Sequence, residues 1–107
     1  MEFVEQDYYG DKILVSKGSE LLDAEISDNI FALFSIENNG VWLKKLWVGK
    51  EYRCNGYAKS MIKNILSKYY NIEGQIEPID DVSLDQLYQI YERLGAEFEG
   101  NIFAIRC

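Results

Sequence analysis

The sequence predicts an α/β or α+β fold, in which a mostly antiparallel sheet carries a helix at each of two places. The first observation is an apolar stripe with the helical period of 3.6 residues between residues 56 and 70. The second is a capping box, Ser83 with Gln86 three residues later, which begins another helix that stops at Gly95. The third is a series of short apolar runs separated by turn residues, which is typical of strands.

Four strands are expected before the first helix. Short strands over 12–16 and 20–27 are followed by turns at Lys17-Gly18-Ser19 and Asp28-Asn29, whereas residues 1–11 indicate no single state. Residues 30–36 are nearly all apolar, which predicts a strand buried on both faces. Asn39-Gly40 then predicts a hairpin that pairs this strand antiparallel with 41–48.

The helix over 56–70 is the clearest element of the chain. Its apolar stripe consists of Ala58, Met61, Ile62, Ile65, Leu66 and Tyr69. A strand over 72–77, ended by the only proline, Pro78, separates it from the helix that begins at Ser83. Two strands, 96–99 and 102–106, follow around a turn at Gly100-Asn101. The predicted order is four strands, helix, strand, helix and two strands.

The stretch from Leu46 to Leu66 combines a strand, a turn with Gly56, and a helix. The first amides of a helix have no partners within it, and the helix dipole adds partial positive charge there. An anion, above all a phosphate, is therefore favoured at this point, and Arg53 would add a charge and a fork of donors. The alternative is an ordinary strand-to-helix turn in which Gly56 serves a steric purpose.

Composition excludes several classes of function. The 107 residues fit one domain, 1–107, and the net charge of −7 argues against a nucleic-acid binder but is compatible with a basic partner. No run approaches the length of a membrane span and the N-terminus has no apolar signal region, so a cytoplasmic protein is expected. The absence of His leaves no Ser-His or Cys-His arrangement and makes a metal site very unfavourable. The two cysteines are expected to be free thiols.

Two motifs together resemble the GNAT superfamily of acetyl-CoA-dependent N-acetyltransferases. The segment Arg53-Cys54-Asn55-Gly56-Tyr57-Ala58 fits the family's Gln/Arg-x-x-Gly-x-Gly/Ala element, and 83–95 is similar to its last helix, with Ala96 in place of the usual Phe. The resemblance covers roughly residues 30–106. It implies a GNAT-like fold with a mixed, mostly antiparallel sheet of six to seven strands and two main helices. Residues 78–99 are also similar to small phage-encoded acetyltransferase-like proteins, among them an anti-CRISPR enzyme.

The resemblance also implies the site residues. The cofactor would be acetyl-CoA, with its pyrophosphate held largely by backbone amides of Arg53, Cys54, Asn55, Gly56, Tyr57 and Ala58. Backbone groups of Leu46, Trp47 and Val48 would face the pantetheine arm, where the family's strands splay apart. Tyr91 falls on the Tyr that often protonates the departing thiolate, or else it packs in the core with Leu87 and Leu94. Tyr88 is expected to pack in the core or to line the acceptor site.

The chain departs from the family in three ways. Trp42 stands where many members place a Glu general base, and the candidates to replace it are Glu77, Asp80 and Asp81, or a water chain, unless these carboxylates are only solvated. Cys54 replaces a frequent glycine, either as a thiol of lowered pKa at a helix N-terminus or as an unreactive filler. The usual N-terminal helices over the acceptor are not evident, which suits a protein lysine or N-terminus as acceptor.

Two classes of function follow from this interpretation. The first is an N-acetyltransferase that acts on a primary amine, with acetyl-CoA and a basic protein acceptor as partners. The second is a GNAT-fold module without turnover, which would bind or inhibit a protein or sense acyl-CoA. The intact phosphate motif and Tyr91 favour the enzyme, whereas the missing base and missing helices favour the module.

Overall fold

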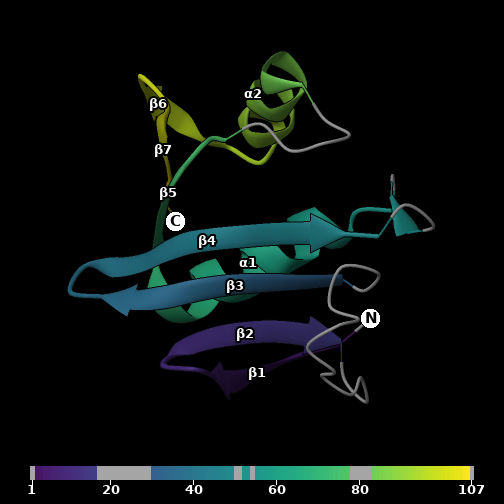
Figure 1. The fold of residues 1–107 in the computed structure, drawn as a ribbon, viewed down its shortest axis with the longest axis vertical. Helices are drawn as coiled ribbons and strands as arrows, with labels where there is room; N and C mark the ends of the chain where they lie inside the picture. Colours follow the sequence, from purple (N-terminus) through teal and green to yellow (C-terminus); the bar gives the residue numbers. More distant parts are fainter. Residues whose placement is uncertain (1, 17–29, 50–51, 54, 78–82, 107) are drawn as a thin grey trace.

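The computed structural model describes residues 2–16, 30–49, 52–53, 55–77 and 83–106. Strands in these ranges form a seven-stranded sheet in the order β1-β2-β3-β4-β5-β7-β6 (Figure 1). The elements in chain order are β1 (Phe3–Tyr8), β2 (Asp11–Ser16), β3 (Ile30–Glu37), β4 (Gly40–Val48), α1 (Tyr57–Tyr69), β5 (Asn71–Gln75), α2 (Leu84–Arg93), β6 (Glu97–Glu99) and β7 (Ile102–Arg106). Neighbouring strands pair antiparallel except β4 and β5, which are parallel. The predicted mixed, mostly antiparallel sheet with two main helices is confirmed.

The predicted strands over 12–16, 30–36 and 41–48 and the order helix, strand, helix and two strands after them are observed, but the first strand of the described chain is β1, which the sequence does not predict. This strand falls within residues 1–11, for which the sequence indicates no single state. It pairs along its whole length with β2 through a two-residue turn at Tyr9 and Gly10, where φ is 47° and 87°. Two positive φ angles are the geometry of a type I′ hairpin. The predicted strand 20–27 lies outside the described residues.

The strand β3 is buried on both faces over most of its length, as predicted. Ile30, Ala32 and Phe34 belong to a large core cluster with both helices, whereas Phe31 packs on the opposite face with Ile13 and Val15 of β2. Only the hairpin end departs from the prediction, because Ile36 is 52% exposed. The predicted antiparallel hairpin between β3 and β4 is confirmed.

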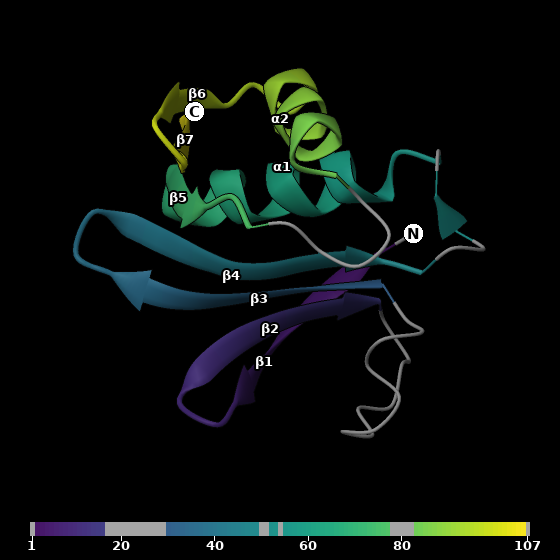
Figure 2. The same ribbon diagram turned by 45° about the horizontal axis from the view of Figure 1, so that its top comes forward.

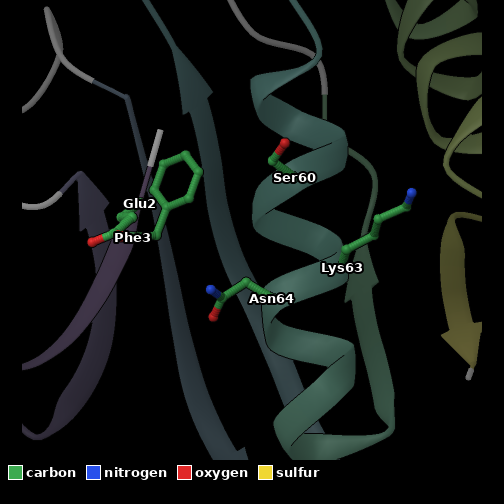
Figure 3. A pocket seen from close by; sticks show the side chains of 5 residues that line it. All are labelled: Glu2, Phe3, Ser60, Lys63 and Asn64. Atoms are coloured by element: carbon green, nitrogen blue, oxygen red, sulfur yellow. The ribbon is translucent and has the colours of Figure 1, made fainter.

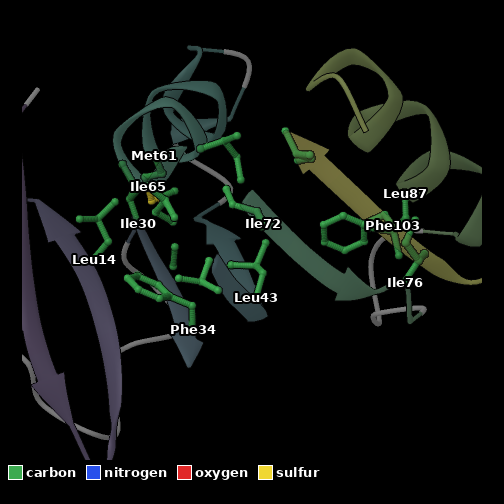
Figure 4. Close-up of a cluster of buried hydrophobic side chains, with 14 residues drawn as sticks. Leu14, Ile30, Phe34, Leu43, Met61, Ile65, Ile72, Ile76, Leu87 and Phe103 are labelled. Carbon is green, nitrogen blue, oxygen red and sulfur yellow. The ribbon is translucent and has the colours of Figure 1, made fainter. Parts of the chain in front are cut away.

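The large cluster joins α1 and α2 to one face of the sheet (Figures 2 and 4). The predicted stripe of α1 is confirmed, since Met61, Ile62 and Ile65 are buried and Leu66 and Tyr69 pack against the cluster. The capping box of α2 is also present, with the Ser83 hydroxyl accepting from the Gln86 amide. No helix of the described residues is long and apolar enough to cross a membrane.

The strands β4 and β5 stay together for only a short distance. They pair over Val41–Leu43 and Ile72–Gly74, and the register of β4 against β3 shifts just beyond, so that Lys44 is an extra residue, a β-bulge. After the bulge β4 continues beside β3 to Val48, while Figure 1 shows β5 leaving it at a steep angle. The two strands therefore separate at Leu43 and Gly74, and one edge of β4 is left without a strand partner in the described chain.

Gly74 allows the close packing at this point. A Cβ built on Gly74 would lie 2.6 Å from Cζ of Phe103 and 3.0 Å from the carbonyl oxygen of Leu43. Contacts under 3.0 Å are not tolerated without a shift, so the Phe103 ring occupies the space of the missing side chain.

We expect Gly74→Ala to lower the free energy of unfolding by about 1–3 kcal/mol, because the new methyl group overpacks against the Phe103 ring. Denaturant unfolding of Gly74→Ala, Phe103→Leu and the double variant checks this. Since Phe103→Leu removes the ring, the double variant should lose less stability than the sum of the two single losses. Strictly additive losses would contradict this account of Gly74.

Candidate functional site

The N-terminus of α1 presents backbone amides without a capping side chain. The N-cap is Gly56, with φ 78° and ψ 12°, and the first turn of the helix carries no acidic residue. The amide of Ser60 is the one that bonds to the Gly56 carbonyl, at 3.0 Å, so the amides before it have no helical carbonyl to reach. Together with the helix dipole, this arrangement favours an anion.

The conformation of Gly56, not crowding, requires glycine at this position. A Cβ at Gly56 would meet no atom within 4 Å, so of the steric reasons considered from the sequence the structure shows the tight bend and not the close approach of another group. The φ of 78° is one that residues with a side chain rarely adopt. The space beside the N-cap is therefore open, and a side chain there would protrude into it.

The side chain of Arg53 connects the turn before α1 to the end of β4 through a hydrogen bond. Its Nε donates to the carbonyl oxygen of Val48 at 3.0 Å, and its guanidinium carbon lies 5.3 Å from the centre of the Trp47 ring. This differs from the expected free fork of donors, because one donor is committed to the protein. Asn55 supports the same turn, since its Nδ2 donates to the carbonyls of Tyr52 and Arg53 at 3.2 and 3.3 Å. Cys54 lies outside the described residues.

The free edge of β4 carries the residues predicted to face the pantetheine arm. Leu46 and Val48 pack against the large cluster on the helix side, whereas Trp47 packs on the opposite face with Phe31. The Nζ of Lys45 lies 5.8 Å from the centre of the Trp47 ring, and the buried Nε1 of Trp47 has no hydrogen-bond partner among the residues that the structure describes. Leu46, Trp47 and Val48 therefore lead from the strand separation directly to the turn that precedes α1.

Tyr91 lies beside the strand separation, on the helix side of the sheet. Its ring stacks on Phe103 with the centroids 4.3 Å apart, and Phe103 in turn occupies the space over Gly74. Burial raises the pKa of Tyr91 to about 12, so the phenol keeps its proton at neutral pH. No group of the described residues forms a hydrogen bond with its hydroxyl. Tyr91 thus packs in the core against the ring that covers Gly74, and its hydroxyl keeps its proton at neutral pH.

Of the remaining candidate residues, some lie in the described structure away from the predicted site, and two lie outside the described residues. The Tyr88 hydroxyl donates to the Gly100 carbonyl at 2.9 Å and its ring packs against Phe98, so Tyr88 serves the core, one of its two expected roles. Trp42 alternates with the buried Val41 and Leu43, which places it on the sheet face away from the helices. Glu77 is exposed after the end of β5. Asp80 and Asp81 lie outside the described residues.

A separate hollow of about 470 Å³ lies between the start of β1 and the flank of α1 (Figure 3). Glu2, directly before β1, and Phe3 of β1 line it on one side, and Ser60, Lys63 and Asn64 of α1 line it on the other. None of the residues predicted to form the site lines this hollow. The strand separation and the N-terminus of α1 remain the places where the predicted residues gather.

Comparison with known proteins identifies the family. The family model described as an acetyltransferase (GNAT) domain matches residues 1–104. The chain belongs to the GNAT acetyltransferase family. Its fold is similar to the anti-CRISPR protein AcrVA5, with a TM-score of 0.58 and 15% identity over 97% of this chain and 98% of that one. It is also similar to a putative GNAT-family acetyltransferase from Bacteroides thetaiotaomicron, with a TM-score of 0.60 and 12% identity over 92% of this chain. The chain spans 62% of that second protein. No curated protein matches the sequence.

The site fits acetyl-CoA, which GNAT proteins typically use. A pyrophosphate suits the uncapped amides at Gly56, because nothing acidic stands in the first turn of α1. The amide groups of a pantetheine arm suit the free edge of β4, since an extended chain can pair with an unpaired strand edge.

Tyr91 should make the stability depend on pH in the alkaline range. Its pKa is about 12 in the folded protein and 10.0 in the reference state, so its contribution is complete below pH 10. Between pH 10 and 12 the unfolded chain loses the proton first, and the free energy of unfolding should fall by about 1.4 kcal/mol per pH unit from this group. Denaturant titrations of wild type and Tyr91→Phe across this range isolate the effect. Equal slopes for the two proteins would contradict the raised pKa.

Proposed function

We propose that the protein is an N-acetyltransferase that transfers an acetyl group from acetyl-CoA to a primary amine, a lysine or N-terminus of a protein acceptor. The observation that carries this proposal is the separation of β4 from β5 at Leu43, followed along the chain by the rest of β4, a turn and the N-terminus of α1 at Gly56, which has no side-chain cap among the described residues. One end of an extended cofactor would lie along the free strand edge and the other on the helix amides. Tyr91 stands beside the separation with its proton retained.

The residues proposed to bind acetyl-CoA have distinct roles. The backbone from Arg53 through Cys54, Asn55 and Gly56 to Tyr57 and Ala58 would surround the pyrophosphate. Arg53 would act mainly by keeping this turn in place, because its Nε is bonded to Val48. Leu46, Trp47 and Val48 would offer main-chain groups to the pantetheine arm. The tie between Arg53 and Val48 connects the two parts of the site.

Bound acetyl-CoA supplies the acetyl group as a reactive thioester. Backbone donors on the free edge of β4 would stabilise the negative charge that develops on the carbonyl oxygen. Tyr91 would give its proton to the departing thiolate, a role that needs a phenol that is neutral before the reaction. The amine must be neutral to attack, so a proton acceptor is needed on the side from which it approaches.

A protein acceptor is favoured by the surface of the chain. Residues 2–16 form a hairpin, so this part of the described chain places no helices over the sheet. The net charge of −7 favours a basic acceptor through electrostatic complementarity. We infer that a lysine or N-terminus on a basic protein surface suits this site better than a small enclosed amine.

The second candidate function is a GNAT-fold module that binds or inhibits a protein without turnover, or that senses acyl-CoA. The observation that favours it is Trp42, which stands where many family members place the general base, and the likeness in fold to AcrVA5, an anti-CRISPR protein, is compatible with it. Release of free CoA in the presence of a protein acceptor distinguishes the enzyme from both modules. Binding of acetyl-CoA without release would identify the sensor.

We expect Arg53→Glu to weaken acetyl-CoA binding by about 100-fold or more, because it breaks the bond to Val48 and places a negative charge before the helix amides. Calorimetric titration with acetyl-CoA, and with free CoA alongside, measures the affinity. Arg106→Glu is the matched control, since Arg106 is exposed at the end of β7 and undergoes the same charge change. Equal affinities for wild type and Arg53→Glu would contradict the site assignment.

We expect Tyr91→Phe to lower turnover by about 100-fold while acetyl-CoA binds with unchanged affinity, because only the proton donor is lost. Tyr88→Phe is the control, since it removes a hydroxyl of the same helix that is bonded to Gly100. The initial rate of CoA release with a basic protein acceptor is the measurement. Full activity of Tyr91→Phe would remove Tyr91 from the chemistry.

A further inference from the structure

Glu73 is a carboxylate that the sequence motifs do not identify and that the fold places at the strand separation. It is the middle residue of the paired stretch of β5, next to Gly74, where pairing with β4 ends. We propose that Glu73 is the general base that takes the proton from the acceptor amine. This inference rests on the proposed acetyltransferase function.

Alternation along β5 determines the face on which Glu73 lies. Ile72 is fully buried in the cluster beneath the helices, and a Cβ on Gly74 would point at the Phe103 ring on that same side. Successive side chains of a strand point to opposite faces, so Glu73 faces the side away from the helices. Its register partner on β4 is Trp42, and adjacent strands lie about 4.8 Å apart. The carboxylate therefore lies beside β4, one residue before the strands part.

The proposed acid, Tyr91, and the proposed base, Glu73, then lie on opposite faces of the sheet, near the place where β4 and β5 separate. Tyr91 lies on the helix side, where its ring stacks on Phe103, the ring that packs over Gly74. Glu73 lies on the other side, one residue before Gly74 on β5. An amine that approaches from the face without helices would meet Glu73, while the thiolate would depart on the side of Tyr91. This arrangement keeps the two proton transfers apart.

The Glu73 carboxylate has one hydrogen bond, from Asn71, and no ion pair within the described part of the chain. It is half-buried, and its Oε1 accepts from Nδ2 of Asn71 at 3.4 Å, which steadies the side chain. The positively charged side chains on this face contact other groups. The Nζ of Lys44 forms a salt bridge with Asp11 at 2.9 Å, and the Nζ of Lys45 lies over the rings of Phe31 and Trp47. The guanidinium of Arg106 lies 3.9 Å from the carboxylate of Glu97. No cation of the described residues forms an ion pair with Glu73.

The other carboxylates near this region are placed less well. Glu77 is exposed beyond the end of β5, and Glu97 and Glu99 lie on β6, which β7 separates from β5. Glu73 is the one in direct register with β4, and so it is nearest to the point where pairing ends. Position in the sheet thus selects Glu73 among these residues.

The proton transfers balance in this arrangement. Glu73 takes one proton from the ammonium group of the acceptor and leaves a neutral amine. The amine nitrogen forms a bond to the acetyl carbon, and the bond from that carbon to sulfur breaks. Tyr91 gives its proton to the thiolate sulfur and regains one from water on the helix side, while the acylated nitrogen loses its second proton to water on the other face. Amide, thiol and one proton, released later by Glu73 to water, are the products.

The test compares wild type with Glu73→Gln in acetyl transfer to poly-L-lysine, measured as CoA thiol released from acetyl-CoA between pH 6 and 10. We expect kcat of Glu73→Gln at neutral pH to fall by about 100-fold, while the acetyl-CoA affinity by calorimetry stays within about twofold. Its residual rate should keep rising toward the pKa of lysine, about 10.4, because the amine must then lose its proton unaided. A merely structural role would not change this pH profile.

Control variants make the outcome decisive. Glu97→Gln should retain full turnover, and Glu73→Asp, which keeps a carboxylate, should recover part of the activity lost in Glu73→Gln. Wild-type rates in Glu73→Gln, or loss of activity in Glu77→Gln instead, would overturn this inference and leave the proposed function standing. If wild type binds acetyl-CoA but releases no thiol, the acetyltransferase function fails and this inference fails with it.

Discussion

The parting of β4 and β5 at Leu43 and Gly74 is the constraint on which the rest of the site depends. The bulge at Lys44 lets β4 continue beside β3 while β5 turns away, and the Phe103 ring packs where a Gly74 side chain would otherwise stand. A backbone edge is thereby left without its usual strand partner, which is costly unless water or a ligand bonds to it. Stability and the proposed function would thus depend on one place, because Tyr91 stacks on the Phe103 ring on one face and Glu73 lies on the other.

A second contact connects this edge to the helix. Arg53 bonds to the last carbonyl of β4 and rests on Trp47, so the turn before α1 cannot move independently of the strand. A pre-arranged turn lowers the cost of ordering the backbone when a ligand binds. This gives a physical reason for an arginine at the start of the motif that differs from a direct bond to phosphate. The uncapped amides at Gly56 then remain for the anion.

Much of the fold could be predicted because its signals are local. The stripe of α1 and the capping box of α2 each lie within one element and the structure shows both, and the antiparallel β3–β4 hairpin is also present, with its loop at Asn38-Asn39 and Gly40 already in β4. The strand β1 could not be predicted, because its turn places Tyr9 at a positive φ that the residue itself disfavours. The strand-turn-helix element and Tyr91 could be proposed from motifs, whereas Glu73 depends on the register between β4 and β5, distant in sequence, and no local pattern marks it. The hydrogen bond from Nε of Arg53 to the carbonyl oxygen of Val48 could not be predicted either, because it depends on where β4 ends.

The most direct test of the central claim is a nuclear magnetic resonance titration of the ¹⁵N-labelled protein with CoA. Backbone amide shifts report which groups the ligand meets, independently of turnover. Our account predicts saturable shifts at the amides of Asn55–Lys59 and of the free β4 edge, Leu46 to Val48, with little change in the β1–β2 hairpin. Shifts that gather instead at the hollow lined by Phe3, Ser60 and Asn64, or a spectrum unchanged at millimolar CoA, would contradict it.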